Sequence, residues 1–194
     1  LTDGGLETDI LFNRGIDLPL FASITLLRTA EGRAALTDYY RGFLDLAARA
    51  GTGFILESAT WRASPDWAEP PGLTLAELAA LNRDAVALRS DLREVYRDRI
   101  ADIVISGCIG PRGDGYDAGR IMTPEEARAY HQWQCELFHG AGCDRLCALT
   151  MTNVPEAIGI AEAASVLAMP LSVSFTVETD GRLPTGDSLA SAIA

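Results

Sequence analysis

The stretch ADIVISGCIGP, residues 101–111, decides the fold that the sequence predicts. Its apolar residues Ile103, Val104 and Ile105 are consecutive rather than alternating, which is typical of a strand covered on both faces. Glycine and proline follow at once and end the strand. Because strands of this kind belong to parallel sheets flanked by helices, the stretch favours an α/β protein.

Helices and strands alternate on both sides of this stretch. The segments TLAE at 74–77 and TPEE at 123–126 are capping boxes, in which a hydroxyl and a carboxylate satisfy backbone N–H groups where a helix begins. The proline of TPEE suits the first helical position, where its missing N–H costs nothing. Apolar spacing and cap residues predict helices over residues 32–50, 75–95, 124–140, 153–168 and 188–194, and further strands over residues 1–3, 52–57, 145–150 and 171–175.

This order, strand then helix five times over, requires parallel strands with helices packed outside them. Two architectures compete, an open doubly wound sheet and a closed barrel of eight units. A dinucleotide-binding sheet needs G-x-G-x-x-G after its first strand, and DGGLETD at residues 3–9 does not supply it. A barrel needs about 250 residues. We therefore predict an α/β protein with a (β/α)8 TIM barrel fold, of which this chain supplies about the first five β/α units.

We expect residues 1–194 to be a single domain, the N-terminal part of that barrel, incomplete at its C-terminus. The chain opens at Leu1 without a methionine and stops at Ala194 inside a helical pattern of small residues. An open arc of strands would leave two unpaired edges and an exposed apolar lumen. Further barrel units or a partner are therefore expected to close the arc, and an oligomer is one possibility.

Composition narrows the classes of function. The chain has 27 acidic and 16 basic residues and a net charge of −11, so it lacks the basic surface of a nucleic-acid binder. No apolar run approaches the roughly 20 residues that span a bilayer, and no signal pattern opens the chain. We expect a cytoplasmic protein that acts on small molecules, with its four cysteines reduced.

Candidate functional residues lie at the ends of the predicted strands. In a barrel the active site is built at the carboxyl ends of the strands. The two carboxylates there are Asp3 and Glu57, and charged groups at the mouth of an apolar barrel require a partner, which favours a functional role. Hydroxyls such as Ser58 and Thr60 accompany them, although polar residues also occur at strand ends that simply approach the surface. No histidine lies at these ends, so a histidine base is not expected.

Three other patterns carry weaker signals. The glycines of residues 107–116 could cradle a phosphate but more simply let a loop turn over the barrel mouth. His131, Cys135 and His139 recur every four residues and could bind a metal, but spacing of four drifts around the helix and the outer face of a barrel helix is not catalytic. The aromatic segment at residues 61–67 either covers the mouth or packs against the next helix.

An ordered set of motifs resembles the homocysteine S-methyltransferase family. These motifs are TDGGLETDI at 2–10, AGTGFILESATWRAS at 50–64, SGCIGPRGDGY at 106–116, and the segment from TPEEARAYHQWQ at 123–134 to ALTMTNVPEAIGI at 148–160. The resemblance implies a (β/α)8 barrel that transfers a methyl group from a donor such as S-methylmethionine, a methylated folate or betaine to the sulfur of homocysteine, which gives methionine. It also implies zinc held by three cysteine thiolates, since a coordinated thiol loses its proton.

Residue by residue, the resemblance implies a substrate site. Asp3 matches the family's carboxylate for the amino group of homocysteine. The other residues that match substrate-binding segments are Gly4, Gly5, Glu57, Ser58 and Thr60. Two departures matter. Leu149 stands where the family often has a second amino-binding glutamate, and the cysteine motifs that hold zinc lie beyond Ala194, so none of the four cysteines here is assigned as a ligand.

Three functions remain open at this point. The first is a zinc-dependent methyltransferase acting on homocysteine or a related thiol. The second is another barrel enzyme, in which Asp3 and Glu57 perform acid/base work on a small polar substrate. The third is a non-catalytic small-molecule-binding barrel or a fragment without activity, because a barrel fold alone does not determine chemistry.

Overall fold

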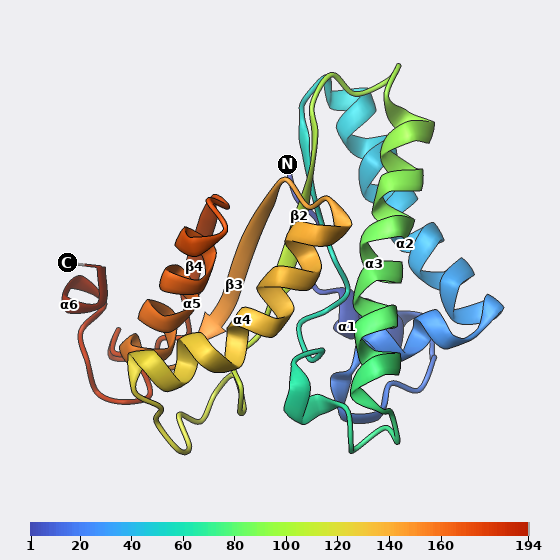
Figure 1. Cartoon of the computed structure of the whole chain (residues 1–194). Helices are drawn as coiled ribbons and strands as arrows, with labels where there is room; N and C mark the ends of the chain where they lie inside the picture. Colours follow the sequence, from blue (N-terminus) through green and yellow to red (C-terminus); the bar gives the residue numbers. More distant parts are fainter. Residues whose placement is uncertain (194) are drawn as a thin grey trace.

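A computed structural model describes residues 1–193, which form a parallel sheet with helices along the chain between its strands (Figure 1). The sheet order β1-β2-β3-β4 follows the sequence. The strands are β1 Phe54–Glu57, β2 Ile103–Ile109, β3 Arg145–Met151 and β4 Leu171–Phe175. The helices are α1 Leu6–Thr8, α2 Ala30–Ala50, α3 Leu75–Tyr96, α4 Pro124–Ala141, α5 Val154–Val166 and α6 Leu189–Ile193.

The strand order separates the two predicted architectures. Every neighbouring pair of strands is parallel and joined by a helix, with no strand inserted between consecutive ones. A doubly wound sheet reverses its strand order at a switch point, whereas a barrel keeps the order of the chain. Along β1, Phe54 and Leu56 are buried while Ile55 and Glu57 are half-buried, so one face packs on helices and the other is less covered. The predicted arc of a TIM barrel is confirmed.

The predicted first strand is shorter than expected. Thr2 forms a single parallel bridge with Ile55, and Ile55 N–H donates to the carbonyl of Leu1 at 2.7 Å. Gly5 then adopts a left-handed backbone with φ 66° and leads directly into α1. Within residues 1–193 the arc therefore has four strands and one bridge rather than five strands.

The predicted helix starts are confirmed by their caps. Thr74 with Glu77 and Thr123 with Glu126 both form complete capping boxes, and the Asn153 side chain accepts from Glu156 N–H. Helix α2 begins at Ala30, two residues before the predicted start, because Thr29 caps it. The predicted helix over residues 188–194 is present as α6, with Ala194 outside the described residues.

Two glycines allow the helices to approach the sheet and each other. A Cβ at Gly107 in β2 would lie 2.5 Å from Phe138 Cδ2 of α4, which is closer than any real contact. A Cβ at Gly159 in α5 would lie 2.5 Å from Ala127 Cβ of α4. Side chains at either position would force α4 away, so close packing here depends on glycine.

Candidate functional site

Asp3 and Glu57 come together at the carboxyl edge of the sheet. Glu57 ends β1 and lies on the face opposite Phe54 and Leu56, which pack into the core with α2 and α3. Asp3 follows the bridge that pairs Thr2 with Ile55, so it lies beside the end of β1. The negative charge of Asp3 is close enough to raise the pKa of Glu57. The structure thus brings the two predicted carboxylates into one site.

The Asp3 carboxylate is largely buried and only partly satisfied. Tyr39 of α2 shares its hydroxyl proton between Asp3 Oδ2 at 3.1 Å and the Gly4 carbonyl at 2.9 Å. Burial raises the pKa of Asp3 above its ordinary value of 3.8, against the opposing effects of the Tyr39 hydroxyl and the Arg89 charge. Asp3 Oδ1 is buried and has no hydrogen-bond partner among the described residues.

Glu57, like Asp3, has a raised pKa and a carboxylate oxygen without a partner among the described residues. Burial raises the pKa of its carboxyl group above 4.5; the neighbouring Ser106 opposes the rise, and the negative charge of Asp3 adds to it. Glu57 Oε2 is buried without a partner in the described part of the chain. Neither Glu57 nor Asp3 forms an ion pair within residues 1–193. Burying such groups without a partner is unfavourable, and a ligand with a positive charge would satisfy both.

The buried Arg89 forms no ion pair with Asp3 or Glu57. Its Nε donates to the Glu57 carbonyl at 3.1 Å and its Nη1 to the Ala85 carbonyl at 3.1 Å. The guanidinium lies over the Tyr40 ring, 4.1 Å from the centroid. Arg89 therefore supports the backbone behind the site, while the Asp3 and Glu57 carboxylates keep free acceptor oxygens.

The predicted hydroxyls Ser58 and Thr60 tie two strand ends together. Cys108 N–H donates to Ser58 Oγ at 2.9 Å, and Thr60 Oγ1 donates to the Cys108 carbonyl at 2.6 Å. The two hydroxyl oxygens are 2.6 Å apart, and because the Thr60 proton is already used, Ser58 is the donor between them. These hydroxyls are engaged by protein, so contact with substrate stays a prediction for them.

Gly4 and Gly5 border a separate hollow on the outer side of the site. This groove, of about 600 Å³, runs between the segment that follows Asp3 and helix α2. Its walls include Thr8 and Asn13 on one side and Tyr39 and Phe43 on the other. No side chain stands between the Gly4 and Gly5 backbone and the groove, which is consistent with the predicted close approach of a ligand.

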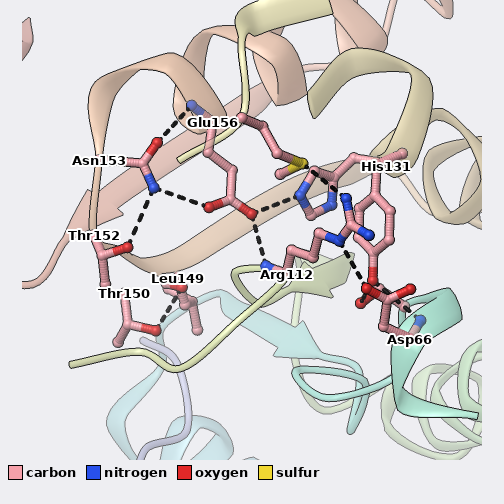
Figure 2. A network of polar contacts seen from close by, with 11 residues as sticks. Asp66, Arg112, His131, Leu149, Thr150, Thr152, Asn153 and Glu156 are labelled. Atoms are coloured by element: carbon pink, nitrogen blue, oxygen red, sulfur yellow. Dashed lines mark hydrogen bonds and ion pairs between the residues drawn. The ribbon is translucent and has the colours of Figure 1, made fainter. Parts of the chain in front are cut away.

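A second polar network, which the sequence did not predict, centres on Glu156 (Figure 2). His131 Nε2 lies 2.9 Å from Glu156 Oε1, Arg112 N–H donates to the same oxygen at 2.6 Å, and Asn153 Nδ2 donates to Oε2 at 3.1 Å. Burial alone would raise the pKa of Glu156, but these hydrogen bonds outweigh it and lower the pKa below 4.5. The buried carboxylate is fully engaged, and it joins α4, α5 and the loop after β2.

His131 contradicts the expectation that the face bearing His131, Cys135 and His139 lies outward. His131 and Cys135 are fully buried against the core, whereas His139 is exposed, so the three do not share one environment. Residues 1–193 contain no group of three side chains that could hold a metal ion. Beside the glycine-rich loop, Arg112 and Arg120 share a cavity of about 280 Å³ with Asp66, Asp114 and Glu156, and these three carboxylates disfavour an anion such as phosphate.

The four cysteines do not fit the zinc that the resemblance implies. Cys108 and Cys147 are register partners on β2 and β3, but no third ligand joins them within the described residues. Burial raises the pKa of Cys108, and burial with the nearby Glu57 charge raises that of Cys147 to about 12. With only two thiols side by side, the described residues fall short of the three thiolates that the resemblance implies.

Comparison with known proteins adds a family and a set of solved structures. The sequence model of a family described as "Homocysteine S-methyltransferase" matches residues 1–194. A selenocysteine Se-methyltransferase of Brassica oleracea var. italica is 25% identical over 217 residues, covering 100% of this chain and 60% of the relative. The chain thus spans about three fifths of that relative's length.

The homocysteine methyltransferase MmuM from Escherichia coli has a similar fold. Its metallated form superimposes with a TM-score of 0.79 at 26% identity, covering 100% of this chain and 68% of that one. Its apo form gives a TM-score of 0.71 at 25% identity, covering 99% and 65%. These matches agree in fold with the arc of parallel strands described above.

Proposed function

Because the chain belongs to the homocysteine S-methyltransferase family, we propose that it serves methyl transfer from a small donor to the thiol of homocysteine, which gives methionine. The observation that carries this proposal is the pair Asp3 and Glu57, two half-buried carboxylates at the carboxyl edge of a barrel sheet, each with one buried oxygen that has no partner among residues 1–193. An α-amino acid brings the positive charge that such a pair lacks. The proposed site is therefore an acceptor site.

The chain's own residues contribute binding and alignment. The acceptor ammonium donates to Asp3 Oδ1 and to Glu57 Oε2, while Tyr39 keeps the other oxygen of Asp3 in place. The sulfur then forms a bond to the methyl carbon as the bond from carbon to the donor heteroatom breaks; the demethylated donor leaves with that electron pair, and the thiol proton passes to solvent. Fixing three atoms in line for such a displacement removes much of its entropic barrier.

A metal ion is supported for the family, whereas zinc in this protein is a proposal. The metallated MmuM structure supports a metal in the family, but residues 1–193 hold no three-ligand group. Zinc bound by cysteines beyond Ala194 stays a prediction from the resemblance. Metal content of the full-length protein, measured by mass spectrometry, tests it.

Four further points stay proposals. The donor is of the S-methylmethionine, methylated folate or betaine type, and the reaction belongs to methionine synthesis in the cytoplasm. No helix within residues 1–193 is long and apolar enough to cross a membrane. Residues 1–194 are proposed to be one domain, and whether chains associate is left to a measurement of mass in solution.

The Brassica relative supports a second acceptor. Because that protein is described as a selenocysteine Se-methyltransferase, a selenol amino acid is a candidate substrate here. Selenocysteine and homocysteine both carry an α-ammonium group, so the same carboxylate pair suits either. Competition between the two acceptors for one donor distinguishes them.

The experiment compares homocysteine with 4-mercaptobutanoate, which lacks the amino group. The full-length protein is supplied with each donor, and the methylated product is measured by mass spectrometry. The wild type should prefer homocysteine, and Asp3→Asn or Glu57→Gln should lower kcat/KM for homocysteine by about 10- to 100-fold, since hydrogen bonds to charged groups contribute about 1.5–3 kcal/mol. Asp98→Asn, at a side chain that is 91% exposed, is the matched control. Equal use of both acceptors by the wild type would refute the ammonium site.

A further inference from the structure

Trp61, in the loop after β1, is seated against two glycines of the loop after β2. A Cβ at Gly110 would lie 2.8 Å from Trp61 Cδ1 and 2.2 Å from the Trp61 carbonyl oxygen. A Cβ at Gly115 would lie 2.9 Å from Trp61 Cζ2. Any side chain at either position would displace the indole or the loop, so the two glycines form a slot for the ring. The Gly115 carbonyl is itself held by Thr176 Oγ1 at 2.7 Å, from the segment after β4.

The indole N–H reaches a strained turn at the end of β3. Trp61 Nε1 donates to Thr150 Oγ1 at 3.0 Å, and Thr150 Oγ1 donates in turn to the Leu149 carbonyl at 2.6 Å (Figure 2 shows the second bond). Thr150 has φ 57°, a left-handed conformation that is costly for a β-branched residue. The pairing of β3 with β4 shifts register between Ala148 and Met151, so Leu149 and Thr150 form a bulge.

This bulge lies at the same edge of the sheet as the proposed acceptor site. Cys147, two residues before Leu149 in β3, is the register partner of Cys108. The Cys108 backbone is in turn hydrogen-bonded to Ser58 and Thr60, which follow Glu57. Bulges next to active sites re-aim side chains that would otherwise follow the strand. We propose that Trp61 is a positioning residue: the hydrogen bond from its indole N–H to Thr150 holds the Leu149–Thr150 bulge and so shapes the wall of the acceptor site. This inference rests on the proposed function.

Trp67 offers a matched control on the same loop. Arg62 packs its guanidinium over both indoles, 4.9 Å from the Trp61 centroid and 4.4 Å from the Trp67 centroid. The Trp67 Nε1 atom, in contrast, is buried and has no hydrogen-bond partner within residues 1–193. Replacing Trp67 by phenylalanine therefore removes similar ring area without removing a hydrogen bond.

The kinetic test uses the full-length protein. Trp61→Phe keeps an aromatic ring but loses the N–H donor, and it should raise KM for homocysteine by about fivefold with kcat within about twofold, as expected for one hydrogen bond. Trp67→Phe should change neither constant by more than about twofold. An unchanged KM in the Trp61 variant, or an equal rise in both variants, overturns the proposal.

A rescue experiment separates positioning from general damage. Thr150→Ala removes the acceptor hydroxyl, so Trp61→Phe and Thr150→Ala should each raise KM for homocysteine by the same factor. The double variant should raise KM no further than either single variant. Thr150→Gly adopts the left-handed conformation without strain, so Trp61→Phe/Thr150→Gly should have a lower KM than Trp61→Phe/Thr150→Ala. Additive effects, or no advantage of glycine, contradict the positioning role.

Hydrogen exchange tests the inference even where no methyl transfer is detected. Trp61→Phe should raise amide exchange in peptides that cover residues 110–117 and 148–153, and Trp67→Phe should not. Absence of this difference overturns the positioning role whatever the activity. Increased exchange without any methyl transfer in the wild type would instead refute the proposed function alone, because the bulge would still be held by Trp61.

Discussion

Glu57, which is half-buried, and Glu156, which is buried, both lie near the carboxyl edge of the same sheet, and their surroundings are opposite. Glu156 receives hydrogen bonds from the Arg112 backbone, Asn153 and His131, and its pKa is lowered. Glu57 has a buried oxygen without a partner among the described residues, and its pKa is raised. Burial is common to both, so the supply of donors decides the direction of the pKa.

The difference separates a structural carboxylate from one available for a ligand. The protein satisfies Glu156 completely and thereby fixes the loop that starts at Arg112. Glu57 and Asp3 retain free acceptors at a position where a barrel enzyme binds its substrate. Unsatisfied buried groups reduce stability, and they persist in native proteins chiefly where function needs them.

The largest expected effect comes from Glu156→Ala. This change leaves the His131 imidazole, the Arg112 N–H and the Asn153 amide without their acceptor, and it should lower the free energy of unfolding by about 3 kcal/mol. Urea denaturation of the full-length protein measures it. Glu162→Ala, at an exposed position of the same helix, should change stability by less than about 0.5 kcal/mol. Similar losses in the two variants would remove the contrast between Glu156 and Glu57.

A smaller effect of opposite sign is expected for Glu57→Gln. The substitution removes a carboxyl group whose charged form is disfavoured by burial and whose Oε2 has no hydrogen-bond partner in residues 1–193, so it should leave stability unchanged or raise it by about 1 kcal/mol. The same urea denaturation reports it. A loss of more than about 1 kcal/mol would show that the charge of Glu57 is satisfied in the protein.

The smallest effect is a difference in pH dependence. Glu156 has a lowered pKa, so its contribution to stability is present above pH 4.5 and is lost as pH falls through its folded value. Asp3 and Glu57 have raised pKa values, so the stability they contribute is present at low pH and is lost as pH rises through their folded values. When the pH is lowered from 7 towards 4.5, the Glu57→Gln variant should therefore gain less stability than the wild type gains. Parallel curves for the two proteins would contradict this sign.

Local signals in the sequence predicted the elements of the fold and the pair of carboxylates in the site. The capping boxes at Thr74 and Thr123 depend on residues three apart, and the buried β2 follows from its own apolar run. Asp3 and Glu57 were found because each is the last residue of a predicted strand. That the two residues lie close together follows from the rule that parallel strands end at the same edge of a sheet.

The rest depends on contacts that no local pattern encodes. His131 and Glu156 are 25 residues apart, and spacing along α4 does not say which helical face meets α5. The Asn153 cap on Glu156 N–H depends on residues three apart, but such a local pattern does not predict the three donors that the Glu156 carboxylate meets. The slot for Trp61 requires Gly110 and Gly115, whose role becomes visible only once the two loops are side by side.

The sequential order of the strands has a consequence for how the chain acquires its structure. Each strand pairs with the one that precedes it, so β2 can dock on β1, and β3 on β2, without waiting for later segments. Chains synthesised from the N-terminus at about 5–20 residues per second can build such a sheet in the order in which it emerges. Co-translational assembly, one βα unit after another, is therefore compatible with every strand pairing in this arc.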